Sequence, residues 1–271
     1  MTEPVGPPSV LHVILKIQAT NGQYNEHCLP FLDGRLERRH ELTVASFLPP
    51  DLDVHHDLRL FSGDGTFRGG VRAVREALAT DPDVVHVHAP QTGAIVLALS
   101  VWRGRRLANA VYTVQNSYAN YRLRNRLLLL PIFAAYPRLV FCSRSALESM
   151  SRPLRWLARH KSTVIDNAVD VDGVAEAIAG GDGKVDDRFH IVSVGRLVDI
   201  KAPLEIVRAV AALSETDVEL TFVGDGPLRP AIEHEARQRG LNGRVHITGM
   251  VPRPDVYRRV ASADLFVSAS Y

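Results

Sequence analysis

The sequence contains little cysteine and no long apolar run. Its two cysteines, Cys28 and Cys142, stand far apart without C-x-x-C spacing, which gives no sign of a disulfide framework or a thiolate metal site. The first residues, M-T-E-P-V-G-P-P, lack the basic start and apolar core of a secretion signal. No apolar stretch approaches the roughly twenty residues that a membrane-spanning helix needs. We therefore expect a cytoplasmic protein that is neither secreted nor threaded through a membrane.

Apolar runs in the second half alternate with amphipathic segments. Strands are predicted where β-branched and other apolar residues cluster, over residues 189–194, 218–223, 245–248 and 265–268. Helices are predicted over residues 203–213, from Pro227 to about Arg239, and from Pro254 onward, because proline is favoured in the first turn of a helix. Strand, turn and helix in repetition predict an α/β fold with a parallel doubly wound sheet.

The first half repeats this alternation. Strands are predicted over residues 10–17, 42–47, 84–89, 110–114, 138–142 and 162–165. Residues 180–187 are dense in glycine and aspartate and lack apolar periodicity, which predicts a linker. We expect a first domain over 1–180, a linker over 181–188 and a second domain over 189–271. Ligands of such sheets bind beyond the carboxyl ends of the strands, which predicts a site in a cleft between the domains.

The turn after residue 194 carries two cations. Gly195-Arg196 is followed by Lys201 at a predicted strand-to-helix junction, where free backbone N–H groups and the helix dipole favour anions. Arginine can bind a diphosphate through a forked pair of hydrogen bonds, and lysine adds a mobile charge. A diphosphate is therefore the expected ligand. The alternative is that both residues are solvated surface cations, as most cations are.

The next junction is glycine-rich. Gly224 and Gly226, before Pro227, allow the positive φ or close backbone approach of a ligand-facing turn. A plain turn is the alternative. The string is not the G-x-G-x-x-G dinucleotide fingerprint, because Arg229 replaces the third glycine. A nicotinamide cofactor is therefore disfavoured.

Four strings in the second half resemble, in order and spacing, the nucleotide-binding domain of the family 4 (group 1) retaining glycosyltransferases. They are V-G-R-L-x-x-x-K (194–201), F-V-G-D-G-P-L (222–228), V-x-I-T-G (245–249) and S-A-D-L-F-V-S-A-S (262–270). The first half is similar more loosely, through D-V-V-H-V-H (83–88), F-C-S-R-S-A (141–146) and V-I-D-N-A-V-D (164–170). The resemblance spans nearly the whole chain.

The resemblance implies a GT-B fold of two Rossmann-like domains, with the nucleotide-sugar donor on the second and the acceptor on the first. It implies no metal and no cofactor. Arg196 and Lys201 would neutralise the donor diphosphate and stabilise it as it departs in a front-face, retaining transfer. The implied donor-binding backbone is that of Gly195, Gly224, Gly226, Gly249, Met250 and Val251, the last three near the nucleobase.

Two departures from the family pattern affect these expectations. Relatives carry T-x-H where this chain has Thr113-Val114-Gln115, so we expect Gln115 to contact the transferred sugar through hydrogen bonds without carrying a proton charge. Relatives also continue beyond the S-x-S string into a helix with two glutamates that bind the donor. We therefore expect a second domain that is incomplete, and a 271-residue polypeptide that binds nucleotide-sugar poorly and turns it over negligibly.

Charge is distributed unevenly along the chain. Between Ser100 and Lys161, eleven arginines and Lys161 are opposed by Glu148 alone, a net charge of +11. The whole chain carries +2, so the remainder carries −9. This asymmetry indicates an anionic partner. The resemblance favours an anionic membrane face or a lipid-diphosphate acceptor over nucleic acid.

One segment of this basic region combines charge with leucine. Arg122-Leu-Arg-Asn-Arg126 precedes Leu127 to Leu130, and such a helix can lie in the plane of a membrane interface. An ordinary helix with a solvated basic side and core-facing leucines is the alternative, slightly favoured by the sequence.

Two further features concern the predicted acceptor side. His86 and His88 alternate along one strand and so share a face, but no third ligand is evident, and structural histidines near the cleft are favoured over a metal pair. No motif gives His12 a role. Asn21-Gly22 follows the first predicted strand, and Gly22 could turn the backbone toward the acceptor.

Three functions agree with the sequence. The favoured one is sugar transfer from a nucleotide-diphosphate sugar to a glycan or lipid-linked acceptor, in polysaccharide or glycolipid synthesis at the cytoplasmic membrane face. The second is a non-catalytic nucleotide-sugar- or glycan-binding remnant. The third is a basic membrane- or nucleic-acid-associated module, which salt-dependent polyanion binding would distinguish.

Overall fold

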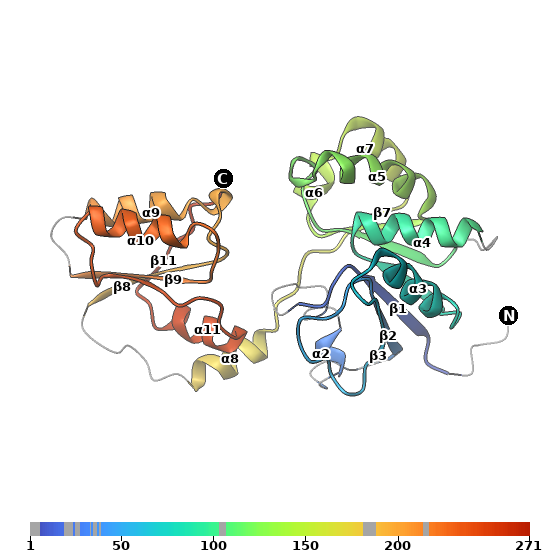
Figure 1. The fold of residues 1–271 in the computed structure, drawn as a ribbon, viewed down its shortest axis with the longest axis horizontal. Coiled ribbons are helices and arrows are strands. Elements are labelled where there is room, and N and C mark those ends of the chain that lie inside the picture. Colours follow the sequence, from blue (N-terminus) through green and yellow to red (C-terminus); the bar gives the residue numbers. More distant parts are fainter. Residues whose placement is uncertain are drawn as a thin grey trace. The chain divides into compact units, whose positions relative to one another are not determined.

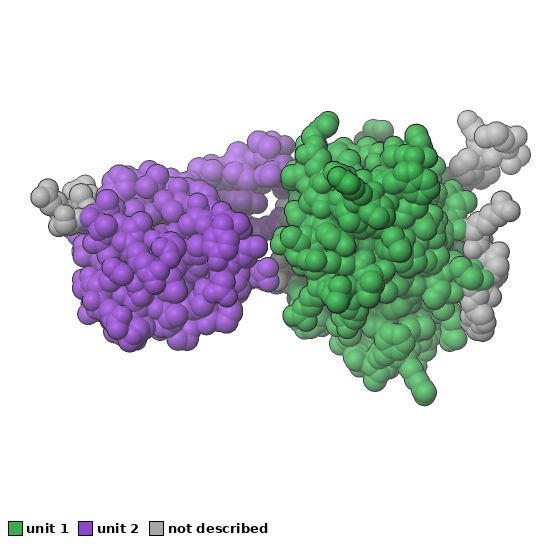
Figure 2. Space-filling model, turned by 90° about the horizontal axis from the view of Figure 1, so that it is seen from above, with its two compact units in different colours: residues 1–168 green, residues 169–271 purple. Residues whose placement is uncertain are grey.

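The computed structural model describes residues 6–18, 24, 28–32, 34, 37, 39–102, 107–180, 188–213 and 217–271. Contacts between Cα atoms divide the chain into two compact units, residues 1–168 and 169–271 (Figure 2). Each unit contains a parallel sheet (Figure 1). The predicted linker falls almost entirely on residues 181–187, which lie outside the described residues.

The first unit contains a seven-stranded sheet of order β3-β2-β1-β4-β5-β6-β7. In that order the strands are Arg59–Ser62, Glu41–Ser46, Ser9–Ile14, Val84–Val87, Ala110–Val114, Arg138–Phe141 and Ser162–Val164. The sequence analysis found all of these except β3, a four-residue edge strand with exposed ends that lacks a strong apolar alternation. The order reverses beside β1, as in doubly wound folds.

Helices cover both faces of this sheet. Side chains of β1, β4 and β5 contribute to a large core shared with α3 (Phe67–Leu78), α4 (Pro90–Trp102) and α5 (Leu123–Ala135). Other side chains of β1 and of β2 form a second core with α2 (Leu29–Leu32), which lies on the other side of the sheet (Figure 1). Further helical segments among the described residues of this unit are η1 (Tyr118–Asn120), α6 (Arg144–Ser149) and α7 (Arg152–Ala158). None of the described helices has the length and hydrophobicity needed to cross a bilayer.

The second unit contains a four-stranded parallel sheet of order β10-β9-β8-β11. The strands are β8 (Phe189–Val194), β9 (Val218–Val223), β10 (Val245–Ile247) and β11 (Leu265–Phe266). Helices α9 (Pro203–Ala211) and α10 (Arg229–Gln238) pack on one face through an apolar core. Helix α8 (Val171–Ala179) packs against α11 (Arg253–Ala261) on the other side of the sheet (Figure 1). These contacts cluster α8 with the second unit, whereas the sequence analysis put residues 1–180 in the first domain.

The predicted start of α10 at Pro227 is wrong. Backbone hydrogen bonds tie the preceding turn to the loop after β8, because the Leu228 amide donates to the Leu197 carbonyl over 3.1 Å. The helix therefore begins at Arg229, and Pro230 is the proline of its first turn. The predictions for α9 and α11 agree with the structure to within two residues, and each begins with a proline in its first turn.

Candidate functional site

Three glycines at strand ends of the second unit have backbone conformations that other residues rarely adopt. Gly195 follows β8 with φ +150°, Gly224 follows β9 with φ +147°, and Gly249 lies after β10 with φ +72°. An isolated antiparallel bridge pairs Gly224 with Gly249. All three glycines were predicted from sequence to face a ligand, and the structure places them on one edge of the sheet, where parallel strands present their carboxyl ends.

The turns after β8 and β9 approach each other too closely for side chains. A β-carbon on Gly224 would lie 2.1 Å from the Gly195 carbonyl oxygen, and one on Gly226 would lie 2.5 Å from that of Leu197. Backbone hydrogen bonds of 3.0 Å join Gly195 to Val223 and Leu197 to Asp225. The two turns therefore form one rigid piece of backbone.

Two exposed cations stand at this edge. Arg196 and Lys201 are exposed, and neither forms an ion pair within the described residues. The Lys201 side chain lies beside Gly195, since a β-carbon there would be 4.0 Å from Lys201 Cε. Lys201 ends the short helix η2 (Asp199–Lys201), directly before α9. Both cations are thus available to bind an anion.

A third cation at this edge is neutralised. Arg229 donates to Glu233 over 3.1 Å and contacts Asp225 at 3.4 Å; these contacts, the Glu233 hydrogen bond first, raise the pKa of the guanidinium. Asp225 also accepts a 2.7 Å hydrogen bond from the Gly226 amide. Sequence reasoning assigned Asp225 no role, although it stands in the F-V-G-D-G-P-L string.

The start of α9 adds to the positive field. Ala202 precedes it in a left-handed conformation, φ +44°, and offers no side-chain cap. Pro203 has no N–H and the Glu205 amide donates to the Ala202 carbonyl over 3.1 Å, so α9 attracts an anion mainly through its dipole. Nothing in the sequence marks Ala202 as left-handed, because alanine seldom adopts that conformation.

Residues after β10 complete the predicted donor-binding set. Gly249 is joined to Gly224 by the bridge, Met250 is 56% exposed and Val251 is half-buried. The Thr248 hydroxyl donates to the Gly249 carbonyl over 2.9 Å, which restrains this turn. Met250 and Val251 thereby present apolar surface next to the glycine turns.

The remaining predicted site residues belong to the first unit. Gln115 follows β5 and is half-buried, while His88 follows β4 and is 3% exposed. Because β4 and β5 are adjacent and parallel, both residues lie at the carboxyl-end edge of that sheet. Gly22 lies outside the described residues. The expectation that His86 and His88 have no third histidine nearby is wrong: His12 Nδ1 lies 3.1 Å from His88 Nε2, because β1 pairs with β4.

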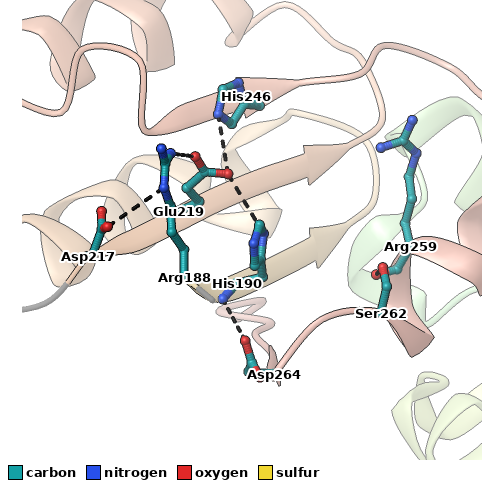
Figure 3. Close-up of polar contacts among 8 residues, drawn as sticks. All are labelled: Arg188, His190, Asp217, Glu219, His246, Arg259, Ser262 and Asp264. Carbon is teal, nitrogen blue, oxygen red and sulfur yellow. Dashed lines mark hydrogen bonds and ion pairs between the residues drawn. The ribbon is translucent and has the colours of Figure 1, made fainter. Parts of the chain in front are cut away.

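At the opposite edge of the second sheet, carboxylates lie close to the basic side chains. Glu219 on β9 is paired with Arg188 and lies 3.7 Å from His190 and 3.8 Å from His246 (Figure 3). Asp217 adds a second carboxylate near Arg188. Arg188 here has acidic partners, in contrast to Arg196 and Lys201, so this edge does not offer the same attraction for an anion.

Two models of known protein families match the two halves of the chain. A family model described as Glycosyltransferase Family 4 matches residues 32–172, more than half of the chain. The chain belongs to glycosyltransferase family 4. A second model, described as Glycosyl transferases group 1, matches residues 188–271, which contain the glycine turns and both cations.

One curated relative of this family 4 chain is "Putative glycosyltransferase EpsF" of Bacillus subtilis, 29% identical over 223 residues. The match covers 74% of this chain and 55% of EpsF, so the chain spans about half the length of that relative.

Solved structures share the fold. HepE of Anabaena in complex with UDP is 17% identical with a TM-score of 0.69, covering 97% of this chain and 74% of HepE. A glycosyltransferase from Rickettsia africae is 14% identical with a TM-score of 0.72, and the match covers 97% of this chain and 73% of that protein. The predicted GT-B class, with two Rossmann-like parallel-sheet domains, is confirmed.

Proposed function

We propose that the protein transfers a sugar, with retention, from a nucleotide-diphosphate sugar to a glycan or lipid-linked acceptor, in the synthesis of cell-surface polysaccharide or glycolipid. The observation that carries this proposal is the pair of exposed cations, Arg196 and Lys201, without acidic partners in the described residues and next to the glycine turns. Family membership supports a transferase, and the neighbour HepE, solved with UDP and with UDP-glucose, supports this donor class.

The chemistry of the leaving group explains the arrangement. When the bond between the sugar and the diphosphate breaks, negative charge grows on the departing oxygen. Arg196, Lys201 and the positive end of the α9 dipole stabilise this charge where it develops, which lowers the barrier. Gly249, Met250 and Val251 then provide a surface for the base, and Gln115 contacts the sugar through its amide. We expect the donor to bind without an added metal ion.

One side of helix α5 combines exposed leucines with arginines. Leu129 is buried in the core and Leu128 packs against it, as an ordinary helix predicts. On another side of the helix, Leu123, Leu127 and Leu130 face solvent, 73%, 68% and 51% exposed. Arg122 and Arg124 are exposed beside them. Apolar side chains flanked by arginines suit the interface of an anionic membrane. We propose that this surface holds the protein on such a membrane.

Turnover distinguishes a transferase from a nucleotide-sugar-binding protein. The protein is incubated with a panel of nucleotide-sugars and a membrane lipid extract, and the nucleoside diphosphate released is quantified. Sugar transfer predicts that release, even if slow, requires both substrates, and that Arg196→Ala abolishes it. If a donor binds but is never consumed, the result would contradict sugar transfer and favour a non-catalytic nucleotide-sugar-binding function.

A further inference from the structure

Three histidines meet on one face of the first sheet. His12 on β1 and His86 on β4 are register partners, and His88 lies two residues further along, so its side chain points to the same face. The ring centroids are 4.9 Å apart for His12 and His86, 5.3 Å for His12 and His88, and 4.0 Å for His86 and His88. One ring nitrogen from each residue lies within 4.8 Å of those of the other two.

The position of this cluster in the sheet favours a ligand. Strands β1 and β4 are neighbours at the point where the strand order reverses, and open α/β sheets bind ligands beside the carboxyl ends of the strands at such a point. His12 and His88 are 5% and 3% exposed, whereas His86 is only partly buried. The cluster is therefore mostly shielded from water but keeps one ring toward solvent.

The spacing and chemistry of the rings fit a metal ion. Two nitrogens bound to one tetrahedral zinc ion at 2.0–2.1 Å lie about 3.3 Å apart, and His12 Nδ1 and His88 Nε2 are 3.1 Å apart. Without metal, one of these nitrogens donates a hydrogen bond to the other; with metal, both lone pairs point to the ion. His86 Nε2 lies 2.7 Å from the Thr113 hydroxyl, the kind of outer contact that orients metal-binding histidines.

We propose that His12, His86 and His88 bind a divalent transition-metal ion of the zinc class. The three ligands are all imidazoles, which suit Zn²⁺, Co²⁺, Ni²⁺ and Cu²⁺, whereas Mg²⁺ and Mn²⁺ prefer oxygen ligands. The site belongs to the first unit and uses none of the proposed donor-binding residues of the second. It therefore does not replace the role of Arg196 and Lys201.

Cobalt titration tests the proposal, because Co²⁺ reports its coordination by visible absorption. The chain is stripped with a chelator and titrated with Co²⁺, followed by Zn²⁺ as competitor and Mg²⁺ as a non-competing ion. We expect one equivalent of tetrahedral Co²⁺, displaced by Zn²⁺ only. His12→Gln, His86→Gln and His88→Gln should each weaken binding by on the order of 100-fold or more, and Thr113→Val by about 10-fold.

The chain offers a matched control in His55, His56 and Asp57, a second and more exposed group within metal-binding distance. His56→Gln should leave the cobalt spectrum and affinity unchanged. A spectrum lost in His56→Gln but kept in the other variants would overturn the proposal, as would a folded wild-type chain that binds no Co²⁺.

A measurement on the unmodified chain covers the case in which a variant fails to fold. Diethyl pyrocarbonate modifies accessible imidazole nitrogens, and mass spectrometry maps the modified histidines. We expect Zn²⁺ to protect His86 and to leave His160 and His234 reactive. Equal modification of His86 with and without Zn²⁺ would also overturn the proposal.

Discussion

Gly224 and Gly249 pair through an isolated bridge that joins the turn after β9 to the turn after β10. A β-carbon on Gly224 would also lie 2.1 Å from the Gly195 carbonyl oxygen. Three strand ends of the second unit are thus linked through one residue that has no room for a side chain. Arg196 and Lys201 lie beside these turns, so the packed backbone holds them in place.

Gly224→Ala should destabilise the second unit by at least about 2 kcal/mol, because it combines a forbidden φ with a clash against backbone. Both tryptophans, Trp102 and Trp156, lie in the first unit, so their fluorescence monitors that unit alone. Circular dichroism reports unfolding of both units. For the variant in urea, we expect the part of the circular-dichroism transition that comes from the second unit to occur at a lower urea concentration than in the wild type, while the fluorescence transition keeps its midpoint.

Gly243→Ala is the matched control for this substitution. Gly243 also has positive φ, +74°, but a β-carbon there meets nothing within 4 Å. Its cost should be only the conformational term of about 1–2 kcal/mol. Equal losses in the two variants would contradict the steric part of the argument.

Asp83 should stabilise the first unit except in acid. Its carboxylate accepts hydrogen bonds of 2.8 Å from the amide and hydroxyl of Ser9, and these contacts, the backbone one first, lower the pKa of Asp83. A depressed pKa in the folded state adds stability above the unfolded pKa, and this stability is lost as the pH falls through the folded value. Asp83→Asn should therefore be less stable at neutral pH, and the difference should vanish in acid.

Urea unfolding followed by tryptophan fluorescence at several pH values measures this effect. Asp264→Asn is an informative control, because Asp264 accepts the same kind of bond from the His190 amide in the second unit. It should leave the fluorescence transition unchanged at every pH. A constant difference between wild type and Asp83→Asn down to the lowest pH would contradict the assignment.

Cys28 should be chemically inert in the folded protein. Burial raises the pKa of its thiol to about 12, and only the thiolate reacts with thiol reagents. In a Cys142→Ser background, which leaves one thiol, modification at mildly alkaline pH should be on the order of 1000-fold slower in the native state than in guanidinium chloride. Similar native and unfolded rates would show that this thiol is accessible.

The sequence predicted elements best where the signal is local. Gly195, Gly224 and Gly249 each follow an apolar run, so both the strands and the glycine turns that end them could be recognised. The start of α10 was misplaced because the tie between Leu228 and Leu197 joins separate loops. The histidine cluster was also missed, since His12 meets His88 only through the pairing of β1 with β4.

The orientation of α5 illustrates a different limit. Leucines occur at four consecutive positions, 127–130, so periodicity alone does not decide which of them face the core. In the structure, Leu129 is fully buried while Leu127 and Leu130 are exposed. Packing against α4 and α7 makes that choice, and no local pattern records it.

Exposed leucines on α5 should contribute to membrane binding but not to folding. Leu127 is 68% exposed, so Leu127→Ser should weaken sedimentation with phosphatidylglycerol vesicles by about 10-fold while leaving the unfolding transition in place. Val171→Ser, at an equally exposed apolar position on α8, should bind as wild type does. Binding that is indifferent to lipid charge, or equally weakened in both variants, would contradict a role for this surface.

Thermal stabilisation by nucleoside diphosphates tests the central claim, that Arg196 and Lys201 form a donor diphosphate site. A ligand present at 100 times its Kd raises the free energy of unfolding by about 2.7 kcal/mol. One nucleoside diphosphate of a panel should raise the Tm of the circular-dichroism transition, and Arg196→Ala and Lys201→Ala should each abolish the shift. Arg237→Ala, an exposed arginine near the end of α10, should retain it. A folded chain stabilised by none of the panel, or a shift that survives in both site variants, would contradict the account.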